Sequence, residues 1–349
     1  MTATTCIGWD IGGAHLKVAR LASDGVILAT AQYATPLWQG LQSLHQELEK
    51  FSRDGAARGA HHALTMTGEL VDLFPNRRAG VDALLHAFAD HFPEGDTSVF
   101  AGREGFLPVA AAHSAFDAVA SANWMATALC AAAQVEHGIL VDIGTTTTDI
   151  IPITNHRPGN QGWNDQDRLA GDELVYTGIV RTPLMALVQR APFRGRWQNV
   201  AAEHFAASAD IYRITGELDE RADLYATADG RGKTVAESRA RLARMLGADV
   251  TAGGPDCWRQ VAEHIAEQQL LMIERAFLNV HDRFDSRLSM KIIGAGAGAF
   301  LARKLARRQQ CDYLDFAELF VNGPVSSYDI ATCAPAVAVA DLSRRMRRQ

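Results

Sequence analysis

The sequence predicts an α/β protein of two domains, because an apolar strand that ends in Asp-Ile-Gly occurs twice in a chain of 349 residues. The first copy runs from Ile7 to Lys17 and the second from Gly138 to Pro152. A third glycine run, Gly294 to Gly298, follows another apolar strand and leads into a predicted helix from Ala299 to Arg308. Each half of the chain is long enough to bury its own core. The repeated hairpin therefore indicates a duplicated core whose two loops face each other.

The second hairpin combines a glycine with a run of threonines: Gly144, Thr145, Thr146 and Thr147. Such a turn presents backbone N–H groups and hydroxyls to an anion, and we expect that anion to be phosphate. Asp142 and Asp149 on either side would repel a bare phosphate, so we expect a hydrated Mg²⁺ between them. An ordinary hairpin with a Gly-Thr turn is the alternative that this pattern alone leaves open.

The first hairpin repeats the pattern with four candidate residues: Asp10, Gly12, Gly13 and Lys17. The third run places three glycines before a helix: Gly294, Gly296 and Gly298. Glycine allows a backbone to approach a ligand closely, and a helix N-terminus favours negative charge. The spacing differs from the dinucleotide fingerprint and lacks its later acidic residue, so a Rossmann domain is the weaker interpretation.

These three stretches, in this order and at these separations, resemble the superfamily of actin, sugar kinases and heat-shock ATPases. In that resemblance, Asp10 to Lys17 is similar to the first phosphate loop, Asp142 to Asp149 to the second, and Gly294 to Gly298 to the adenosine loop. The resemblance implies a two-domain actin-like ATPase (ribonuclease H-like) fold with a cleft between duplicated domains. We expect an N-terminal domain over 1–135 and a C-terminal domain over 136–349. The latter would carry an insertion at about 184–256 and a final helix that crosses back to the first domain.

Composition fits a globular protein, with 48% apolar and 21% charged residues. The net charge of −6 gives no reason to expect nucleic acid or an acidic membrane as a partner. The five cysteines, at 6, 130, 257, 311 and 333, have neither close pairing nor metal-ligand spacing, which predicts reduced thiols in a cytoplasmic protein. We expect neither a signal peptide nor a membrane span. An exposed apolar stripe on one helix could support a homo-oligomer.

In the first domain, we expect strands at 4–9, 15–21, 26–33, 62–66 and 97–101, and helices at 37–51, 81–92 and 116–133. The last helix would hold Asn123 near its middle, which is unfavourable unless that side chain has a partner or faces solvent. Glu69 follows a strand at its carboxyl end, where ligands gather in open α/β sheets. A solvated loop acid is the alternative for Glu69.

In the second domain, polar side chains interrupt the apolar stretch from Ala170 to Pro183, and we take Glu173, Tyr176 and Arg181 as candidate substrate contacts. Arg181 is a planar donor suited to phosphate or carboxylate, and a helix-to-loop junction with a structural ion pair is the alternative. The stretch 206–247 is predicted to be the least regular and to cap the cleft. Within it, the glycine-flanked Arg231 and Lys233 could bind an anion, or could form a solvated basic turn. Helices are expected at 257–281 and 335–347.

Three further stretches sharpen the resemblance: 171–183, 210–216 and 227–234. They are similar to a branch of the hydantoinase A and oxoprolinase-type group that is linked to tetrahydromethanopterin-dependent one-carbon transfer. Archaeal members of that branch resemble the enzyme that forms the furan-methyl aryl ether of methanofuran. The resemblance implies a transferase that condenses an aminomethyl-furan-methyl diphosphate with the phenol of a glutamyltyramine or tyrosine unit, and that releases diphosphate. In a bacterium it would serve methylofuran, the analogue of that cofactor.

For that reaction we expect Asp10 and Asp142 to position Mg²⁺, directly or through water. Lys17 and the turn from Gly144 to Thr147 would hold the diphosphate, since its charge grows as it leaves. Either Glu69 or Asp149 would take the phenol proton, and the sequence does not decide between them.

Two other classes of function remain open. An ATP-dependent small-molecule kinase or oxoprolinase-type hydrolase is favoured slightly by the glycine run at Gly294, although the chain has only the size of the nucleotide-fold part of such hydrolases. A nucleotide-binding sensor would need a DNA-binding or partner module, which the sequence does not show.

Overall fold

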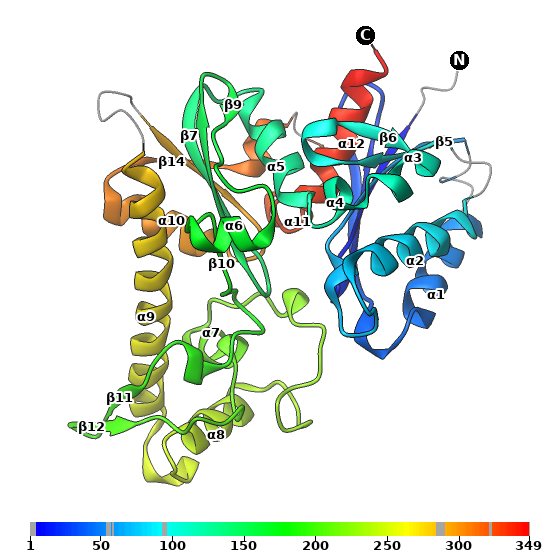
Figure 1. The fold of residues 1–349 in the computed structure, drawn as a ribbon. Helices are drawn as coiled ribbons and strands as arrows, with labels where there is room; N and C mark the ends of the chain where they lie inside the picture. The colour runs from blue at the N-terminus through cyan, green and yellow to red at the C-terminus, as the bar shows by residue number, and fades with distance from the viewer. Residues whose placement is uncertain are drawn as a thin grey trace. The chain divides into compact units, whose positions relative to one another are not determined.

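The computed structural model describes residues 5–53, 57, 59–92, 96–283, 290–320 and 323–348. The chain forms two compact units. The first comprises Met1–Gly138, Ile153–Gly159 and Leu314–Gln349, and the second comprises Ile139–Pro152 and Asn160–Tyr313. Strands and helices alternate along both units, which confirms the predicted α/β class (Figure 1).

The sheet of the first unit has the strand order β3-β2-β1-β4-β5-β6. Its strands are β1 Cys6–Ile11, β2 His15–Leu21, β3 Ile27–Ala34, β4 His61–Met66, β5 Asp96–Phe100 and β6 Phe106–Pro108. β1, β2 and β3 are antiparallel, whereas β4 runs parallel to both β1 and β5. The first three strands are confirmed to within two residues. The turn between β2 and β3 contains Gly25 at φ 96°, a conformation that favours glycine.

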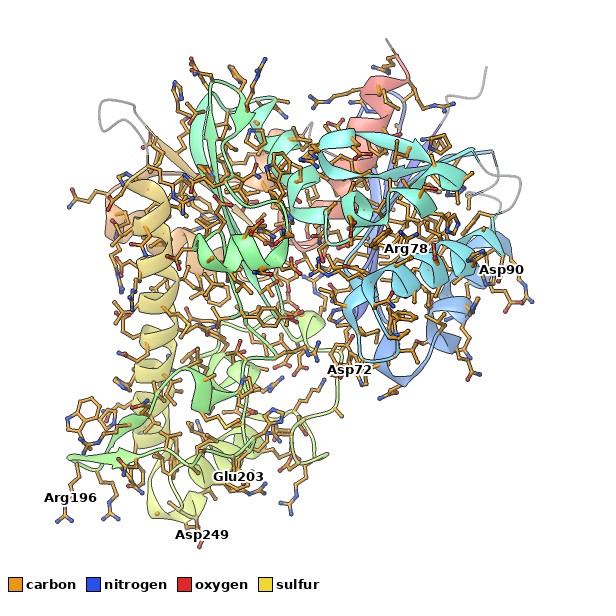
Figure 2. All side chains as sticks on the ribbon, viewed as in Figure 1. Asp72, Arg78, Asp90, Arg196, Glu203 and Asp249 are labelled. Carbon is orange, nitrogen blue, oxygen red and sulfur yellow. The ribbon has the colours of Figure 1, made fainter. Side chains whose placement is uncertain are left out.

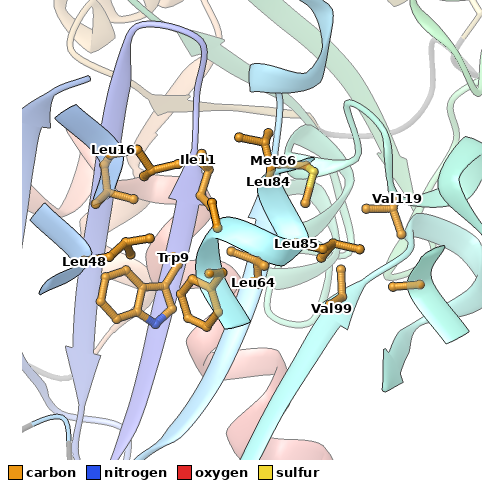
Figure 3. Packing of buried hydrophobic residues seen from close by; sticks show 14 of the residues in the cluster. Trp9, Ile11, Leu16, Leu48, Leu64, Met66, Leu84, Leu85, Val99 and Val119 are labelled. Carbon is orange, nitrogen blue, oxygen red and sulfur yellow. The ribbon is translucent and has the colours of Figure 1, made fainter. Parts of the chain in front are cut away.

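One face of this sheet packs on helices α1 (Gln42–Arg53) and α2 (Arg77–Ala89), and Trp9 belongs to the apolar cluster between them, where it lies beside Leu48 (Figure 3). The Trp9 ring contacts Phe51 and Phe88 edge-on, and its Nε1 donates to His62 Nδ1 at 3.1 Å. This bond satisfies the indole N–H inside an apolar core.

The other face of the sheet packs on the last helix, α12 (Ala334–Met346), which lies along β1 and β2 (Figure 1). At Gly8 in β1, a Cβ would overlap the Ala336 carbonyl oxygen and would lie 2.9 Å from Ala340 Cβ. The close approach of helix and strand therefore requires glycine at this position. α12 also packs on α5 (Asn123–Ala132).

The long helix predicted over 116–133 is wrong, because the chain breaks there. α3 covers Val109–Ser114, α4 covers Phe116–Val119 and α5 begins only at Asn123. Ser121 lies in the break with φ 51°, a left-handed conformation that ends α4. Asn123 is thus the first residue of a helix, where its Oδ1 accepts a bond from Trp124 N at 2.7 Å. The helix predicted from Leu37 is divided similarly, into a short turn, η1 Leu37–Gln39, and α1.

The second sheet has the order β10-β8-β7-β13-β14, with β9 paired to β8. Its strands are β7 His137–Ile143, β8 Thr148–Thr154, β9 Arg157–Pro158, β10 Leu174–Val175, β13 Lys291–Ala295 and β14 Asp312–Asp315. In the chain, helix α6 (Asp165–Ala170) follows β9, and helix α10 (Ala299–Gln309) follows β13. Thus each of the two predicted Asp-Ile-Gly strands lies within a sheet and leads into a hairpin, at β1–β2 and at β7–β8.

The predicted insertion at about 184–256 contains β11 Arg190–Phe193, β12 Arg196–Asn199, α7 Ser208–Thr215 and α8 Val235–Met245. The two helices, α7 and α8, lie within 206–247, the stretch predicted to be the least regular. These elements pack along α9 (Pro255–His281), where Trp258 stacks on Phe193 with ring centroids 4.8 Å apart. Charged side chains here, such as Arg196, Glu203 and Asp249, are exposed, and those of Arg196 and Asp249 point away from this assembly (Figure 2).

The five cysteines all lie in described ranges and are free thiols. Burial raises the pKa of Cys6 to about 12, and Cys130 is shifted in the same direction for the same reason. Among the residues that the structure describes, no helix is both long and apolar enough to cross a membrane. α9 exposes Leu271 and Leu278, at 41% and 39% of their surface. A homo-oligomer through such a stripe stays a prediction.

Replacing Gly8 by alanine is expected to lower the free energy of unfolding by at least about 2 kcal/mol, because the new methyl group forces β1 and α12 apart. Urea unfolding of Gly8→Ala would measure this loss. Gly254→Ala is the matched control, since a Cβ there meets nothing within 4 Å, and it should cost less than about 1 kcal/mol. Equal losses in the two variants would contradict the proposed steric role of Gly8.

A histidine pair predicts how stability depends on pH. His45 Nδ1 and His91 Nε2 lie 3.0 Å apart, and burial, followed by the charge of His45, lowers the pKa of His91. The folded state therefore takes up its proton less readily than the unfolded chain, so stability should fall as pH drops through about 6.5. Chemical unfolding between pH 7.5 and 5 would show a smaller decline in His91→Gln. The same decline in both proteins would refute this assignment.

Candidate functional site

Asp10 and Lys17 lie directly opposite each other in the β1–β2 pair, so their side chains project from the same face of the sheet. Asp10 is 4% exposed. The charges of Lys17 and Asp10 both affect the pKa of the Cys333 thiol, which lies just before α12. Burial raises its pKa to about 12, Lys17 opposes that rise and Asp10 adds to it. The acid–base pair of the first hairpin thus lies on the α12 side of the sheet, near the start of that helix.

The first turn is held by main-chain contacts at both of its glycines. Gly12 N donates to His15 O at 2.9 Å, and Gly13 O accepts a bond from Leu37 N at 3.0 Å. A Cβ on Gly13 would lie 2.8 Å from a methyl group of Val71. Glycine therefore keeps this turn compact, and its predicted phosphate contact remains a prediction.

Glu69 lies beside this first turn. Thr67 N donates to Ile11 O at 3.0 Å, and the Cβ position of Gly68 lies 3.2 Å from the Gly12 carbonyl carbon. Glu69 follows in a single turn, η2 Gly68–Leu70, and is only 1% exposed. The alternative of a solvated acid is therefore wrong, since the carboxylate is buried and accepts a hydrogen bond from Ser121 Oγ at 2.7 Å.

The second turn is clamped by residues that follow it by more than thirty positions. Ile179 N donates to Gly144 O at 3.1 Å, and Arg181 N donates to Thr145 O at 2.9 Å. A Cβ on Gly178 would lie 2.5 Å from the Thr146 nitrogen, so this peptide fits only against glycine. The turn is closed by Gly144 N, which donates to Thr147 O at 2.8 Å. The threonine loop thus has one defined backbone conformation.

Asp142 is the last residue but one of β7, beside this turn, and is 7% exposed. Gly296 approaches it closely, because a Cβ there would lie 2.5 Å from Asp142 Oδ1 and would overlap the Ile143 carbonyl oxygen. Gly298 packs on Ile143 and Ile179, and its N–H donates to Ile143 O at 2.8 Å. The glycine run therefore packs directly against the end of β7 and the second turn.

Packing within the protein is enough to explain why the third run contains glycines. At Gly294, a Cβ would overlap the Tyr313 hydroxyl and would lie 2.7 Å from its ring. At all three glycines, the missing side chain makes room for other parts of the protein. Sequence reasoning attributed this room to a ligand, and nucleotide binding by the loop stays a prediction.

Asp149 and Glu173 belong to a polar network inside the second unit. Arg168, which is 1% exposed, pairs through Nη2 with Asp149 Oδ1 at 2.5 Å and donates to the Glu173 carbonyl at 3.1 Å. The Glu173 carboxylate is fully buried, where it pairs with Arg283 at 2.7 Å and accepts a bond from Gln161 N at 2.7 Å. Burial raises the pKa of Asp149, and Arg168 opposes the rise. Glu173 therefore takes part in a structural ion pair with Arg283, while its predicted role as a substrate contact stays a prediction.

The remaining substrate candidates differ in exposure. Tyr176 is 66% exposed. The exposed Arg181 lies with its guanidinium 5.8 Å from the ring centroid of Tyr225. Burial raises the pKa of Tyr225, against the influence of Arg181, so this phenol is neutral. The backbone of Arg181 thus contacts the second turn, and its side chain lies beside the Tyr225 ring.

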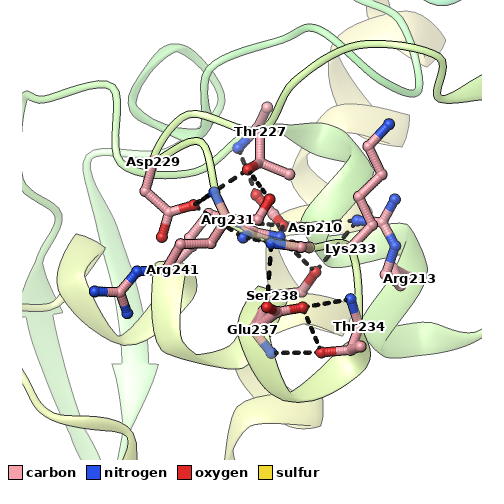
Figure 4. Close-up of polar contacts among 12 residues, drawn as sticks. Asp210, Arg213, Thr227, Asp229, Arg231, Lys233, Thr234, Glu237, Ser238 and Arg241 are labelled. Atoms are coloured by element: carbon pink, nitrogen blue, oxygen red, sulfur yellow. Dashed lines mark hydrogen bonds and ion pairs between the residues drawn. The ribbon is translucent and has the colours of Figure 1, made fainter.

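The segment containing Arg231 and Lys233 is fixed by buried charges that sequence reasoning missed (Figure 4). Arg241 on α8 is fully buried, where it contacts Asp210 at 2.8 Å and Asp229 at 3.1 Å. Lys233 Nζ donates to the Asp223 carbonyl at 2.6 Å and pairs with its carboxylate at 3.2 Å. The exposed Arg231 lies in the turn that these contacts hold. The Ser-x-x-Arg spacing of α8 is the signal that could have revealed this inward face.

The structure thus assembles the predicted residues in two groups. In the first unit, the first turn lies beside Glu69. In the second unit, the threonine turn lies beside Asp142, Gly296, Gly298 and Arg181. Across the described ranges, no cluster of three or more His, Cys, Asp or Glu side chains could hold a metal ion. A donor set of one or two carboxylates suits Mg²⁺, which keeps most of its water ligands, better than it suits a caged metal.

Comparison with known proteins identifies the family. The chain belongs to the hydantoinase/oxoprolinase family, Hydantoinase_A, whose match covers residues 61–346. It is 29% identical over 340 residues to a protein of Methanocaldococcus jannaschii named (4-{4-[2-(gamma-L-glutamylamino)ethyl]phenoxymethyl}furan-2-yl)methanamine synthase. That alignment covers 97% of each chain. A Methanococcus vannielii protein of the same name is 37% identical over 112 residues, which are 32% of this chain and 50% of that one.

Among solved structures, acetone carboxylase in its nucleotide-free form matches with a TM-score of 0.56 and 10% identity. The alignment covers 97% of this chain and 70% of that one. A ROK family glucokinase from Streptomyces griseus matches with a TM-score of 0.47 and 15% identity, over 98% of this chain and 99% of that one. At these identities, the similarity to acetone carboxylase shows the fold alone.

Replacing Arg241 by methionine is expected to lower the free energy of unfolding by about 3–5 kcal/mol, because it removes the guanidinium that the buried Asp210 shares with the half-buried Asp229. Urea unfolding would measure the change. The control is Arg259→Met, which removes an exposed ion pair with Glu263 and should cost less than about 1 kcal/mol. A loss for Arg241→Met no larger than that of the control would show that the network contributes little.

Proposed function

We propose that this chain forms an aryl ether during assembly of a methanofuran-type cofactor, which in a bacterium would be methylofuran. The reaction joins an aminomethyl-furan-methyl diphosphate to the phenol of a glutamyltyramine or tyrosine unit. The observation that carries this proposal is the alignment with the Methanocaldococcus jannaschii synthase over 97% of both chains. The name of that relative describes a phenoxymethyl-furan, which is the ether that such a condensation gives.

In the proposed reaction, the bond between the furfuryl carbon and the diphosphate oxygen breaks, and the electron pair leaves with diphosphate. The furan oxygen stabilises the positive charge that develops on the carbon. The phenol oxygen then forms the new carbon–oxygen bond, and its proton passes to a carboxylate of the enzyme. Atoms and charges balance without an oxidant or a nucleotide.

The residues of the two groups suit this chemistry. Lys17, the turn from Gly144 to Thr147, and Arg181 would hold the diphosphate, whose negative charge grows in the transition state. Asp10 and Asp142 would hold hydrated Mg²⁺, which when bound neutralises part of that charge. Two observations support this assignment: each aspartate closes a strand before a glycine turn, and each is less than 10% exposed.

ATP-dependent phosphoryl transfer is the less supported alternative. Its argument from sequence was the glycine run at Gly294, which resembles an adenosine loop. The room left by these glycines is filled by Tyr313, Asp142 and Ile143. The presence of glycine at these positions is therefore explained without a bound nucleotide. The similarity to acetone carboxylase, at 10% identity, adds nothing about ATP.

The proposed function predicts phenol-dependent release of diphosphate from the furfuryl diphosphate in the presence of Mg²⁺. Asp142→Asn should lower kcat about 100-fold or more, because it weakens stabilisation of the leaving group. Asp249→Asn, a change of the same kind at an exposed residue, should leave kcat unchanged. Coupled detection of diphosphate, with the ether identified by mass spectrometry, would measure both.

The same assay separates the alternatives. ADP release from ATP without the furan substrate would favour a kinase or hydrolase, and tight ATP binding without product would favour a sensor. Near-normal turnover by Asp142→Asn would overturn the metal role.

A further inference from the structure

Ser121 adopts a backbone conformation that a serine rarely takes. Its φ of 51° lies in the left-handed region, where a Cβ crowds the following carbonyl. It lies in the break between α4 and α5 and is 8% exposed. Glycine would fit this conformation at lower cost, so a serine here indicates a requirement for its hydroxyl.

The hydroxyl of Ser121 donates to Glu69 Oε1 at 2.7 Å. The main chain of Glu69 is fixed from another side by α2, because a Cβ on Gly80 would overlap the Glu69 carbonyl oxygen and lie 2.7 Å from its Cα. Two elements distant in sequence therefore hold this one residue, one by its backbone and one by its carboxylate. Such support is typical of a side chain whose orientation matters.

Glu69 is also placed where the chemistry is expected. The residues before it bond to Ile11 and pack on Gly12. Glu69 therefore follows the end of β4, which lies beside the end of β1 that carries Asp10. With an exposure of 1%, it is withheld from bulk water.

Asp149, the other candidate base, is held differently. The permanently charged guanidinium of Arg168 lies 2.5 Å from its carboxylate, and Arg168 is 1% exposed. Proton uptake by Asp149 would remove the negative charge from this buried ion pair, which opposes the rise in pKa that burial causes. The same guanidinium also supports the Glu173 carbonyl, so the pair is part of the internal framework.

Building on the proposed function, we propose that Glu69 takes the phenol proton and that Ser121 is the residue that positions its carboxylate. As the phenol oxygen bonds to the furfuryl carbon, its proton passes to Glu69, which then releases it to water. The Ser121 hydroxyl stabilises the ionised form of Glu69 and points it in one direction. Ser121 itself exchanges no atom with the substrates.

The test uses two variants that lose the same hydroxyl and differ in strain. Ser121→Ala keeps the crowded Cβ, whereas Ser121→Gly removes it, so the glycine variant should have a Tm higher than the alanine variant by about 2–4 °C. Both should shift the acidic limb of the kcat/KM profile to higher pH, by about one unit, because the carboxylate loses a donor that favours its ionised form. Equal shifts in variants of unequal stability would show that the hydroxyl acts on the base and not on the fold.

Glu69→Gln supplies the second measurement. It should lower kcat about 100-fold or more while leaving the Kd of the furfuryl diphosphate within about twofold, since a general base contributes mainly to the chemical step. Glu104→Gln, at an exposed glutamate of the same unit, is the control and should match the wild type.

The outcomes separate this inference from the function on which it rests. If the wild type forms no ether, the proposed function fails, and the roles of Glu69 and Ser121 fail with it. If the wild type forms the ether and Glu69→Gln turns over within about twofold of it, Glu69 is not the base. If both Ser121 variants keep the wild-type pH profile and lose activity only in proportion to stability, Ser121 is a structural residue.

Discussion

The backbone clamp on the Gly144–Thr145 peptides is the constraint on which the second group of candidate residues depends. Ile179 N, Val180 N and Arg181 N all donate to this short stretch, and Gly178 packs against it without a side chain. Because the turn is held by main-chain bonds, the backbone N–H groups of its threonines have fixed directions. The same clamp carries Arg181 to the edge of the turn. Preorganised donors of this kind can stabilise a developing anion without first rearranging.

The buried charged residues of this protein fall into two groups that differ in their surroundings. Arg168 and Arg241 are each at most 1% exposed, and each joins carboxylates or carbonyls from distant segments. Such groups specify which segments meet, and removing one partner leaves a charge inside the protein. Asp10, Asp142 and Glu69 are buried as well, but they follow or close strands at turns built from small residues. That difference in setting, more than burial itself, distinguishes candidates for chemistry from the framework.

Family membership and geometry contribute different parts of the functional argument. The match over residues 61–346 establishes the hydantoinase/oxoprolinase family. Proteins of this fold catalyse many different reactions, so the fold alone does not identify the reaction. The residues of the site and the relative that aligns over 97% of both chains support the proposed reaction. No motif pointed to Ser121, since its left-handed conformation and its bond to Glu69 exist only in the folded chain.

The sequence by itself determined the α/β class, the strands around Asp10 and Asp142, and the helices α9 and α12, because the spacing of apolar residues and the Asp-Ile-Gly turns act locally. It could not determine that the helix over 116–133 breaks at Ser121, since the stabilising contact comes from Glu69, about fifty residues away. Nor could it distinguish glycines that admit a ligand from glycines that admit Tyr313 or Asp142. Only tertiary structure decides which groups occupy the room that a missing side chain leaves, because those groups come from distant parts of the chain.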